Sequence, residues 1–356
     1  MLVRAACTYF FLLLFSLPPL QAYCRSADAR LRGAMVASRP TAQDLRDLAA
    51  LGANHIRWQL TWGGFPKSPA DTASPEAYRQ WLRENIWYVK SMLPLCDSLG
   101  LRVLIDLHTL PGGQAFEAEK YLGHRMFRDP AQAAAFRLAW EDIPLAFRHE
   151  KAIWGYDLAN EPETVPIDPD LWRRMYPRIA EQVRALDPHK VIVIEGNPFG
   201  GIKGLTRLHP VPQLGPVVYS FHMYEPIAFT HQGVHGALEG FPYPGTISGK
   251  LWDSAALRQA MQPVRDWQLL HNARIYVGEF SAIRWAPDSS AYRYLRDCIT
   301  LFEEWGWSWA YHAWREWDGW SVEYGSNQSD AQPATEPTDR LLLLKDVFRK
   351  NKPVLE

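Results

Sequence analysis

The feature that most constrains the fold of this chain is the regular alternation of short apolar segments with longer amphipathic ones. Eight short segments have the composition of buried strands, and most stretches between them show the apolar spacing typical of helices. This alternation indicates parallel strands joined by helical crossovers, because a parallel strand is reached only through a long connection. The expected strands cover residues 31–37, 54–60, 101–107, 153–159, 191–195, 217–222, 275–278 and 307–311.

Several of the expected helices open with residues that favour a helix start. Thr41, Ser74, Asp129, Asp168 and Asp253 fit the N-cap position, and a proline directly follows three of them. The connection after the fifth strand has no clear helical pattern, so we expect a degenerate crossover there. The expected helices cover residues 41–51, 75–99, 130–147, 169–186, 254–272, 288–305 and 337–349.

Eight strands with seven or eight helices predict an α/β protein, a single (β/α)8 TIM barrel with extended βα loops. A barrel of about 250 residues with long loops accounts for the 356 residues of the chain, and neither a linker nor an internal repeat marks a second module. The long connections at 61–74, 108–129, 223–252 and 312–336 all follow strands. In a TIM barrel such loops build the active face.

The first 22 residues have the pattern of a secretory signal peptide. Arg4 precedes an apolar run, and the segment ends at the small residue Ala22. A membrane anchor is the alternative, but the run is shorter than the roughly 20 residues that span a bilayer, and Pro18 and Pro19 interrupt it. We therefore expect cleavage after residue 22, a folded domain over 23–356, and no membrane span in the mature protein.

The composition argues against several classes of partner. The chain has 38 Lys+Arg and 39 Asp+Glu residues and no basic run, so nucleic acid is not an expected partner. Cys24, Cys96 and Cys298 remain after cleavage, an odd set that implies no disulfide framework, and we expect the last two to be buried apolar side chains. No closely spaced Cys/His group predicts a metal site. The 16 Trp, 15 Tyr and 15 Phe indicate stacking on a flat ligand.

Polar residues at the ends of six predicted strands are the strongest sign of a functional site. A barrel strand would otherwise end in packing or turn residues, and all of these ends lie on one face. Two glutamates on different strands suit a pair of carboxyl groups in different protonation states, which glycoside hydrolysis requires. A buried salt bridge between Glu279 and Arg57 is the structural alternative for one of them. The residues are Arg57, Asp106, His108, Asn160, Glu161, His222, Tyr224, Glu279 and Trp314.

These residues make the sequence similar to glycoside hydrolase family 5, the cellulase-type family of retaining β/α-barrel hydrolases. The acid/base of that family stands in an Asn-Glu-Pro sequence after the fourth strand, matched here by Asn160-Glu161-Pro162. The nucleophile follows the seventh strand, matched by Gly278-Glu279-Phe280. The resemblance implies Glu161 as acid/base and Glu279 as nucleophile. The substrate-binding residues that it implies are Arg57, His108, Asn160, His222, Tyr224 and Trp314.

The resemblance also implies a double displacement that retains the anomeric configuration. Glu279, held ionised by Arg57 and hydrogen-bonded by Tyr224, would attack the anomeric carbon. Glu161 would donate a proton to the leaving oxygen and later accept one from water. This chemistry uses the carboxyl groups directly, so we expect no metal and no organic cofactor.

Aromatic residues in the loops after the strands are candidates for outer sugar subsites. An indole can stack on the apolar face of a β-linked pyranose, and packing within the loop is the equal alternative for each. The candidates are Trp62, Trp285, Trp317 and Trp320, with Phe116, Phe229 and Tyr243 as weaker ones. The acids Glu163, Glu225, Glu316 and Asp318 are more simply explained as solvated surface charge, and we do not assign them.

The expected function is that of a secreted endo-β-1,4-glucanase, extracellular or periplasmic, that acts as a monomer on β-linked polysaccharide or oligosaccharide. A β-mannanase, a xyloglucanase, a β-1,3-glucanase or a glycolipid-directed enzyme of the same family is the alternative, because the loops that select the sugar cannot be read from one sequence. A carbohydrate-binding barrel without catalysis belongs to a different class. The presence of both glutamates argues against it.

Overall fold

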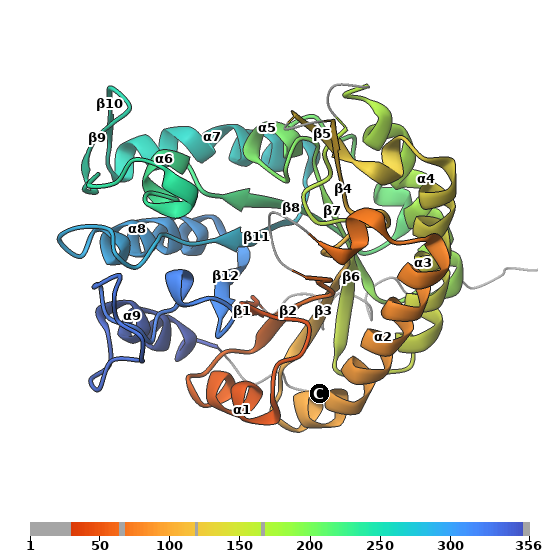
Figure 1. The fold of residues 1–356 in the computed structure, drawn as a ribbon, viewed down its shortest axis with the longest axis horizontal. Helices are drawn as coiled ribbons and strands as arrows, with labels where there is room; N and C mark the ends of the chain where they lie inside the picture. Colours follow the sequence, from red (N-terminus) through yellow and green to blue (C-terminus); the bar gives the residue numbers. More distant parts are fainter. Residues whose placement is uncertain (1–29, 64–67, 118–119, 165–167, 352–356) are drawn as a thin grey trace, which may run out of the picture. The chain divides into compact units, whose positions relative to one another are not determined.

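The computed structural model of the chain describes residues 30–63, 68–117, 120–164 and 168–351, so the predicted signal peptide lies outside the described residues. Within them, eight parallel strands close into a barrel in the order β1-β12-β11-β8-β7-β6-β3-β2 (Figure 1). The prediction of a single (β/α)8 barrel is confirmed. The barrel strands are β1 (Arg32–Val36), β2 (His55–Gln59), β3 (Arg102–Asp106), β6 (Ile153–Asp157), β7 (Val191–Glu195), β8 (Val217–Met223), β11 (Ile275–Phe280) and β12 (Ser308–Trp314).

Helices surround the barrel (Figure 1). Four predicted N-caps are confirmed, since the side chains of Thr41, Ser74, Asp129 and Asp253 each accept a backbone N–H of the first turn. The helix after the fifth strand is only four residues long, as expected. The helices are α1 (Ala42–Ala50), α2 (Pro75–Ser98), α3 (Pro130–Phe147), α4 (Leu171–Leu186), α5 (Ile202–Leu205), α6 (Ile227–Thr230), α7 (Ser254–His271), α8 (Ser290–Trp305) and α9 (Asp339–Phe348).

The predicted start of α4 is wrong by two residues. Asp168 does not cap the helix, because one of its carboxylate oxygens accepts the backbone N–H of Asp170 at 2.9 Å and the other contacts the guanidinium of Arg174. Because of this local turn the first helical residue is Leu171, and the proline at position 169 lies before the helix.

Two antiparallel hairpins that the sequence did not predict extend the loops after strands. One lies after β3 and pairs β4 (Gln114–Glu117) with β5 (Lys120–His124), and the other lies after β8 and pairs β9 (Gly245–Ile247) with β10 (Lys250–Trp252). Short 3-10 helices complete the loops: η2 (Pro69–Thr72), η3 (Arg125–Phe127), η4 (Pro212–Leu214), η5 (Val234–Gly236) and η6 (Asp318–Trp320).

The strands alternate between an outer and an inner face. In β2, Ile56 and Trp58 pack outward in the large core between barrel and helices, whereas Arg57 on the inner face is completely buried. A small apolar cluster that includes Leu104 and Val193 fills the inside of the barrel. This apolar floor lies below the polar residues at the strand ends and supports them.

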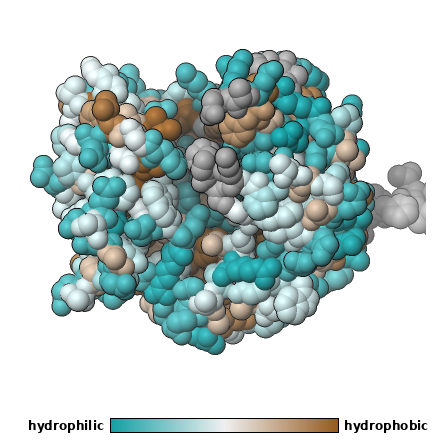
Figure 2. All heavy atoms as spheres, in the orientation of Figure 1, coloured by the Kyte–Doolittle hydropathy of each residue, from teal (hydrophilic) through white to brown (hydrophobic). Residues whose placement is uncertain are grey.

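The surface has few large apolar areas on the face shown in Figure 2. Apolar side chains gather over the region of α6 and the β9–β10 hairpin in Figure 2. Ile227 in α6, Leu238 after η5 and Leu251 in β10 are exposed. Cys96 and Cys298 are buried and free, as predicted. None of the helices in the described residues is long and apolar enough to cross a membrane.

Candidate active site

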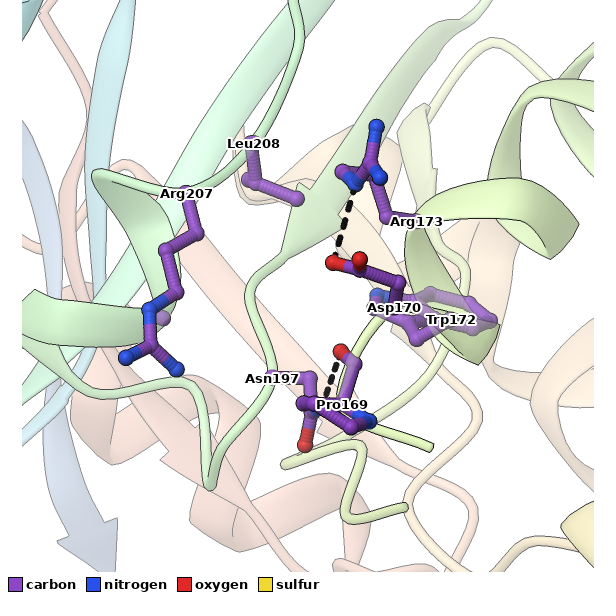
Figure 3. A pocket seen from close by; sticks show the side chains of 8 residues that line it. Pro169, Asp170, Trp172, Arg173, Asn197, Arg207 and Leu208 are labelled. Carbon is purple, nitrogen blue, oxygen red and sulfur yellow. Dashed lines mark hydrogen bonds and ion pairs between the residues drawn. The ribbon is translucent and has the colours of Figure 1, made fainter. Parts of the chain in front are cut away.

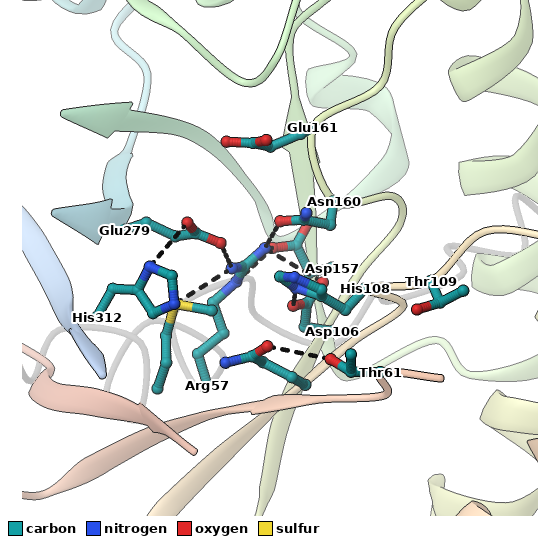
Figure 4. Close-up of polar contacts among 12 residues, drawn as sticks. Arg57, Thr61, Asp106, His108, Thr109, Asp157, Asn160, Glu161, Glu279 and His312 are labelled. Carbon is teal, nitrogen blue, oxygen red and sulfur yellow. Dashed lines mark hydrogen bonds and ion pairs between the residues drawn. The ribbon is translucent and has the colours of Figure 1, made fainter. Parts of the chain in front are cut away.

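The site is built around the guanidinium of Arg57, which is fully buried at the mouth of the barrel (Figure 4). Nη1 donates to Oε1 of Glu279 at 2.7 Å, Nη2 to Oε1 of Glu195 at 2.8 Å, and Nε to Oδ2 of Asp157 at 3.0 Å. Oδ1 of Asp106 lies 3.2 Å from Nη2. The four carboxyl groups come from β11, β7, β6 and β3. The ion pair expected between Glu279 and Arg57 is therefore one part of a network that ties the strand ends together.

The carboxyl groups of this network differ in how readily they ionise. Burial and the neighbouring carboxylate of Glu195 raise the pKa of Asp157 well above its ordinary value, although Arg57 opposes the shift. The pKa of Glu195 itself is lowered, because the positive charges of His222 and Arg57 outweigh its burial. The network thus favours a proton on Asp157 and a negative charge on Glu195.

Glu279 is the buried carboxylate of the site and is only 4% exposed. Its Oε2 accepts the hydroxyl of Tyr224 at 3.0 Å and lies 3.3 Å from Nδ1 of His312 and 3.6 Å from Nδ1 of His222. Burial alone would raise the pKa of Glu279, but the charges of His222, His312 and Arg57 hold that pKa well below its ordinary value. A carboxylate that stays ionised in an enclosed site suits a nucleophile.

Glu161 is the open carboxylate of the site, with a side chain that is 34% exposed. Its Oε1 lies 2.8 Å from Nδ1 of His222. One oxygen of Glu161, one oxygen of Glu279 and a ring nitrogen of His222 lie within 4.8 Å of one another. The two carboxyl groups therefore lie close together, and both approach Nδ1 of His222.

The backbone of Glu161 is held in an unusual conformation. Its φ of 45° lies in the left-handed region, which costs a residue with a side chain about 1–2 kcal/mol. The N–H of Glu161 donates to Oε2 of Glu195 at 2.9 Å, and Oε1 of Glu195 lies 3.0 Å from Nε2 of His222. Glu195 thus holds both the backbone of Glu161 and the imidazole that contacts its carboxylate.

Two other predicted residues complete the inner site. Oδ1 of Asn160 accepts from Nη2 of Arg57 at 3.1 Å, so the amide nitrogen is the group that Asn160 presents to a ligand. Nδ1 of His108 lies 2.8 Å from Oδ2 of Asp106. Burial would lower the pKa of His108, but the charges of Asp106 and Glu279 raise it above its ordinary value. Figure 4 shows both residues grouped with Arg57 and the two glutamates.

The prediction that Trp314 binds substrate is wrong. Trp314 is 4% exposed, its indole N–H donates to the carbonyl of Asp44 at 2.9 Å, and the guanidinium of Arg315 covers its ring. The cause is a bulge between β1 and β12, in which Ala34 pairs with Tyr311 but Val36 pairs with Trp314. The extra residue in β12 turns Trp314 to the outer face of the barrel.

His312 stands at the end of β12 on the inner face, and sequence reasoning missed it. Its Nδ1 contacts the hydroxyl of Tyr224 and faces Glu279, and its Nε2 lies 3.2 Å from Oε2 of Glu316. Glu316 is therefore part of the site and not a solvated surface charge. Burial would lower the pKa of His312, but the charges of Glu279 and Glu316 raise it to about 10.

The predicted outer tryptophans differ in how much ring they expose. Trp320 is 7% exposed and packs against His312 with ring centroids 5.9 Å apart, so its ring contacts the imidazole and offers little surface to a sugar. Trp62 stacks on Trp81 and is partly buried. Trp317, 40% exposed, meets the edge of Trp285 with ring centroids 6.1 Å apart. Trp317 remains the best placed of the four for a ligand.

A second aromatic group lies beside the acid/base segment. Phe116 and Phe199 are 44% and 48% exposed, and both rings contact Tyr121, with ring centroids 5.5 Å and 6.1 Å from it. The N–H of Phe199 donates to the carbonyl of Pro162, directly after Glu161. Phe116 was a weak candidate from the sequence, and Phe199 was missed. The weak candidates Phe229 and Tyr243 are wrong, because both are completely buried. Glu163 is buried too, so the expectation that it is a solvated surface charge is wrong.

Glu161, His222 and Glu279 are also the group of side chains in the described residues that could hold a metal ion by their spacing. Arg57 and His312 already offset the charge of Glu279. A separate pocket of about 160 Å³ lies between the start of α4 and the segment around α5, and its lining contains none of the site residues (Figure 3). Its lining is Pro169, Asp170, Trp172, Arg173, Asn197, Gly204, Arg207 and Leu208.

Comparisons with known proteins agree with this geometry. The sequence profile of the cellulase family (glycosyl hydrolase family 5) matches residues 24–318. Endoglucanase C of Acetivibrio thermocellus is 23% identical over 290 residues, which are 74% of this chain and 80% of that protein. A solved glycoside hydrolase shares the fold, with a TM-score of 0.69 and 22% identity over 89% of this chain and 99% of the other.

The barrel also resembles Cel5A of Thermotoga maritima, which has been solved in a mutant form with cellobiose. The TM-score is 0.68 and the identity 20%, over 90% of this chain and 98% of the other. A further structure of Cel5A holds mannotriose. Similarity at these identities establishes the fold, whereas the profile match over most of the chain establishes the family. This chain is a glycoside hydrolase and belongs to the cellulase family, glycosyl hydrolase family 5.

Proposed function

We propose that this chain is a retaining endo-β-1,4-glucanase with Glu279 as nucleophile and Glu161 as general acid and base. One observation carries the proposal: an ionised, buried glutamate faces a partly exposed glutamate, with carboxylate oxygens no more than 4.8 Å apart. Retaining glycosidases separate the two carboxyl groups by about 5–5.5 Å, and inverting enzymes by about 6.5–9.5 Å. The short separation supports retention.

In the first step an oxygen of Glu279 bonds to the anomeric carbon while the bond to the leaving sugar breaks. Glu161 gives its proton to the departing oxygen. In the second step Glu161 takes a proton from water, the water oxygen bonds to the anomeric carbon, and Glu279 leaves as a carboxylate. The exposure of Glu161 suits this role, because both the leaving sugar and the water must reach it.

The surrounding polar groups have separate roles in this mechanism. Arg57 and Tyr224 bind the two oxygens of Glu279 and orient it for attack. The amide nitrogen of Asn160 donates to the sugar 2-hydroxyl, a contact that strengthens in the transition state. His222 orients the carboxylate of Glu161, and His108 presents its Nε2 to a ring hydroxyl.

The names of the similar proteins support β-1,4-glucan as the substrate. The matched relative is an endoglucanase, and Cel5A was solved with cellobiose. A β-mannanase is the second candidate, because Cel5A was also solved with mannotriose. An endo mode of action is supported by exposed aromatic side chains on both sides of the two glutamates, Phe199 next to the acid/base segment and Trp317 in the loop after β12.

Release of reducing sugar from cellulose, glucomannan, xyloglucan and laminarin, followed by chromatography of the products, tests the substrate. We expect internal cleavage and the highest rate on β-1,4-glucan. Proton NMR of the first product should show the β-anomer. A faster rate on xyloglucan or laminarin than on cellulose would overturn the substrate assignment, and an α-anomer would overturn the mechanism.

We also propose that the protein is exported and acts as a monomer. The pattern of the first 22 residues supports export. N-terminal sequencing of the protein recovered outside the cytoplasm should begin near residue 23, and size-exclusion chromatography with light scattering should give one chain. An uncleaved N-terminus or a dimer would contradict these expectations.

A further inference from the structure

His312 is a charged group that faces the nucleophile from the end of β12, where the family resemblance led us to expect a tryptophan. Its ring is 14% exposed and lies between two carboxylates, with Nδ1 3.3 Å from Oε2 of Glu279 and Nε2 3.2 Å from Oε2 of Glu316. The same oxygen of Glu316 accepts from Nε2 of Gln59 at 2.7 Å. Trp320 packs against the imidazole and fixes its plane.

We propose that His312, paired with Glu316, is a positioning residue for the nucleophile, and that its charge opposite Glu279 sets the lower end of the pH range in which the enzyme works. The inference rests on the proposed role of Glu279 as nucleophile. It does not depend on which polysaccharide is cleaved.

The charged neighbours of Glu279 show why His312 matters. A second cation close to a carboxylate favours its ionised form. Arg57 and His222 already supply positive charge, but each of them is shared with Glu195, whereas His312 is shared with Glu316. The groups that face Glu279 or His312 are Arg57 from β2, His108 after β3, Glu161 after β6, Glu195 from β7, His222 and Tyr224 from or after β8, His231 after α6, and Glu316 after β12.

The charge of His312 has opposite effects on the two chemical steps. In the first step Glu279 forms a bond to the anomeric carbon and loses its negative charge, so a nearby cation makes it a weaker nucleophile. In the second step the bond breaks and the charge returns to Glu279, so the same cation stabilises the departing carboxylate. His312 therefore favours hydrolysis of the covalent intermediate.

The test compares pH profiles of kcat/KM with an activated aryl β-cellobioside, because kcat/KM reports the ionisation of the free enzyme. In His312→Gln the acid limb should move toward higher pH by about one unit, since one opposite charge is lost. Rapid-mixing measurements should show a larger burst of aryl release, because the second step is slowed.

The matched control is His231→Gln. His231 lies in the same cluster, with its ring 5.0 Å from that of Tyr224, but its Nδ1 contacts the hydroxyl of Thr230 and not a carboxylate, and burial lowers its pKa to about 4. Its acid limb should coincide with that of the wild type. If His312→Gln leaves the acid limb in place, or if both variants shift it equally, the inference is overturned.

Glu316→Gln tests the role of Glu316 as the partner of His312. The Glu316 side chain is 28% exposed, so its replacement disturbs the packing less than that of a fully buried residue. Its acid limb should not move upward, because His312 stays charged opposite Glu279 at low pH. On the alkaline side its kcat with the aryl substrate should fall at a lower pH than that of the wild type, because an uncharged His312 no longer stabilises the departing carboxylate of Glu279 in the second step. An unchanged alkaline side would refute the role of Glu316. Failure of the proposed function would appear separately, as absent endo-cleavage of β-1,4-glucan.

Discussion

Replacing Glu195 with glutamine should impair both stability and catalysis, although Glu195 touches no substrate atom in the proposed mechanism. Its two oxygens accept from Arg57 at 2.8 Å, from His222 at 3.0 Å and from the N–H of Glu161 at 2.9 Å. Glutamine has one acceptor oxygen and one donor group, so at least one of these donors would face another donor. The negative charge between Arg57 and His222 would also be lost.

The magnitudes follow from these contacts. Removing one partner of a buried ion pair costs about 3–5 kcal/mol. Because glutamine still accepts one or two hydrogen bonds, we expect about 3 kcal/mol of lost stability and a fall in Tm of about 6 °C. Glu161 would lose the acceptor that holds its left-handed backbone. A displacement of a catalytic group by about 1 Å costs about 100-fold in rate, or about 2.7 kcal/mol.

A matched control separates the two effects. Asp187 precedes the amino-terminal end of β7, whereas Glu195 stands at its carboxyl end. Asp187 is 1% exposed and accepts the hydroxyl of Tyr156 at 2.7 Å and two backbone N–H groups. Asp187→Asn should lower Tm by a similar amount and leave kcat/KM unchanged well below Tm, because that end of a barrel contributes to stability and not to chemistry. Thermal unfolding by circular dichroism and initial rates on β-glucan measure both. Wild-type kcat/KM in Glu195→Gln, or an equal loss in Asp187→Asn, would refute the reasoning.

Three further predictions concern binding, metals and Trp314. Phe199→Ala should lower kcat/KM on cellopentaose about fivefold, through about 1 kcal/mol of lost stacking. It should leave kcat/KM on cellobiosyl fluoride unchanged, because the fluoride leaving group places no sugar ring beside Glu161. An equal loss on both substrates would contradict a sugar subsite at Phe199. Chelators should leave the rate unchanged, and a loss reversed by zinc would mean that Glu161, His222 and Glu279 hold a metal. Trp314→Phe should cost about 1 kcal/mol of stability, through the lost bond to Asp44, and leave KM on β-glucan unchanged.

The fold could be predicted because local pattern and global architecture agree. The barrel strands are short apolar runs between strong helix-start signals, and their order along the chain is their order around the barrel. The β4–β5 hairpin was missed because its strands, Gln-Ala-Phe-Glu and Lys-Tyr-Leu-Gly-His, have no consistent alternation and lie outside the barrel core. The hairpin is also held by residues distant in sequence, since Asp71 accepts the backbone N–H of Gln114 at 2.9 Å and the carbonyl of Glu163 accepts that of His124 at 3.0 Å.

The site could be predicted only in part. The rule that a polar residue ending an apolar strand faces the cavity found Arg57 and Glu279, and it would also have found Glu195 at the end of Val-Ile-Val-Ile-Glu. His312 was missed because the eighth strand was expected to end at Tyr311. A one-residue bulge changes which side chains face inward, and no local sequence signal reports it.

The network around Arg57 also limits how this barrel can be recombined. The arginine belongs to the first half of the chain, but two of its carboxyl partners, Glu195 and Glu279, belong to the second. A chimaera that joins the amino-terminal half of this barrel to the carboxy-terminal half of another (β/α)8 barrel would still have eight strands in the same order. It would still bury a guanidinium without two of its four carboxyl partners unless the donor half supplied acids at the ends of its first and third strands. In this protein, therefore, the strands that carry Arg57 and its four carboxyl partners must be exchanged together.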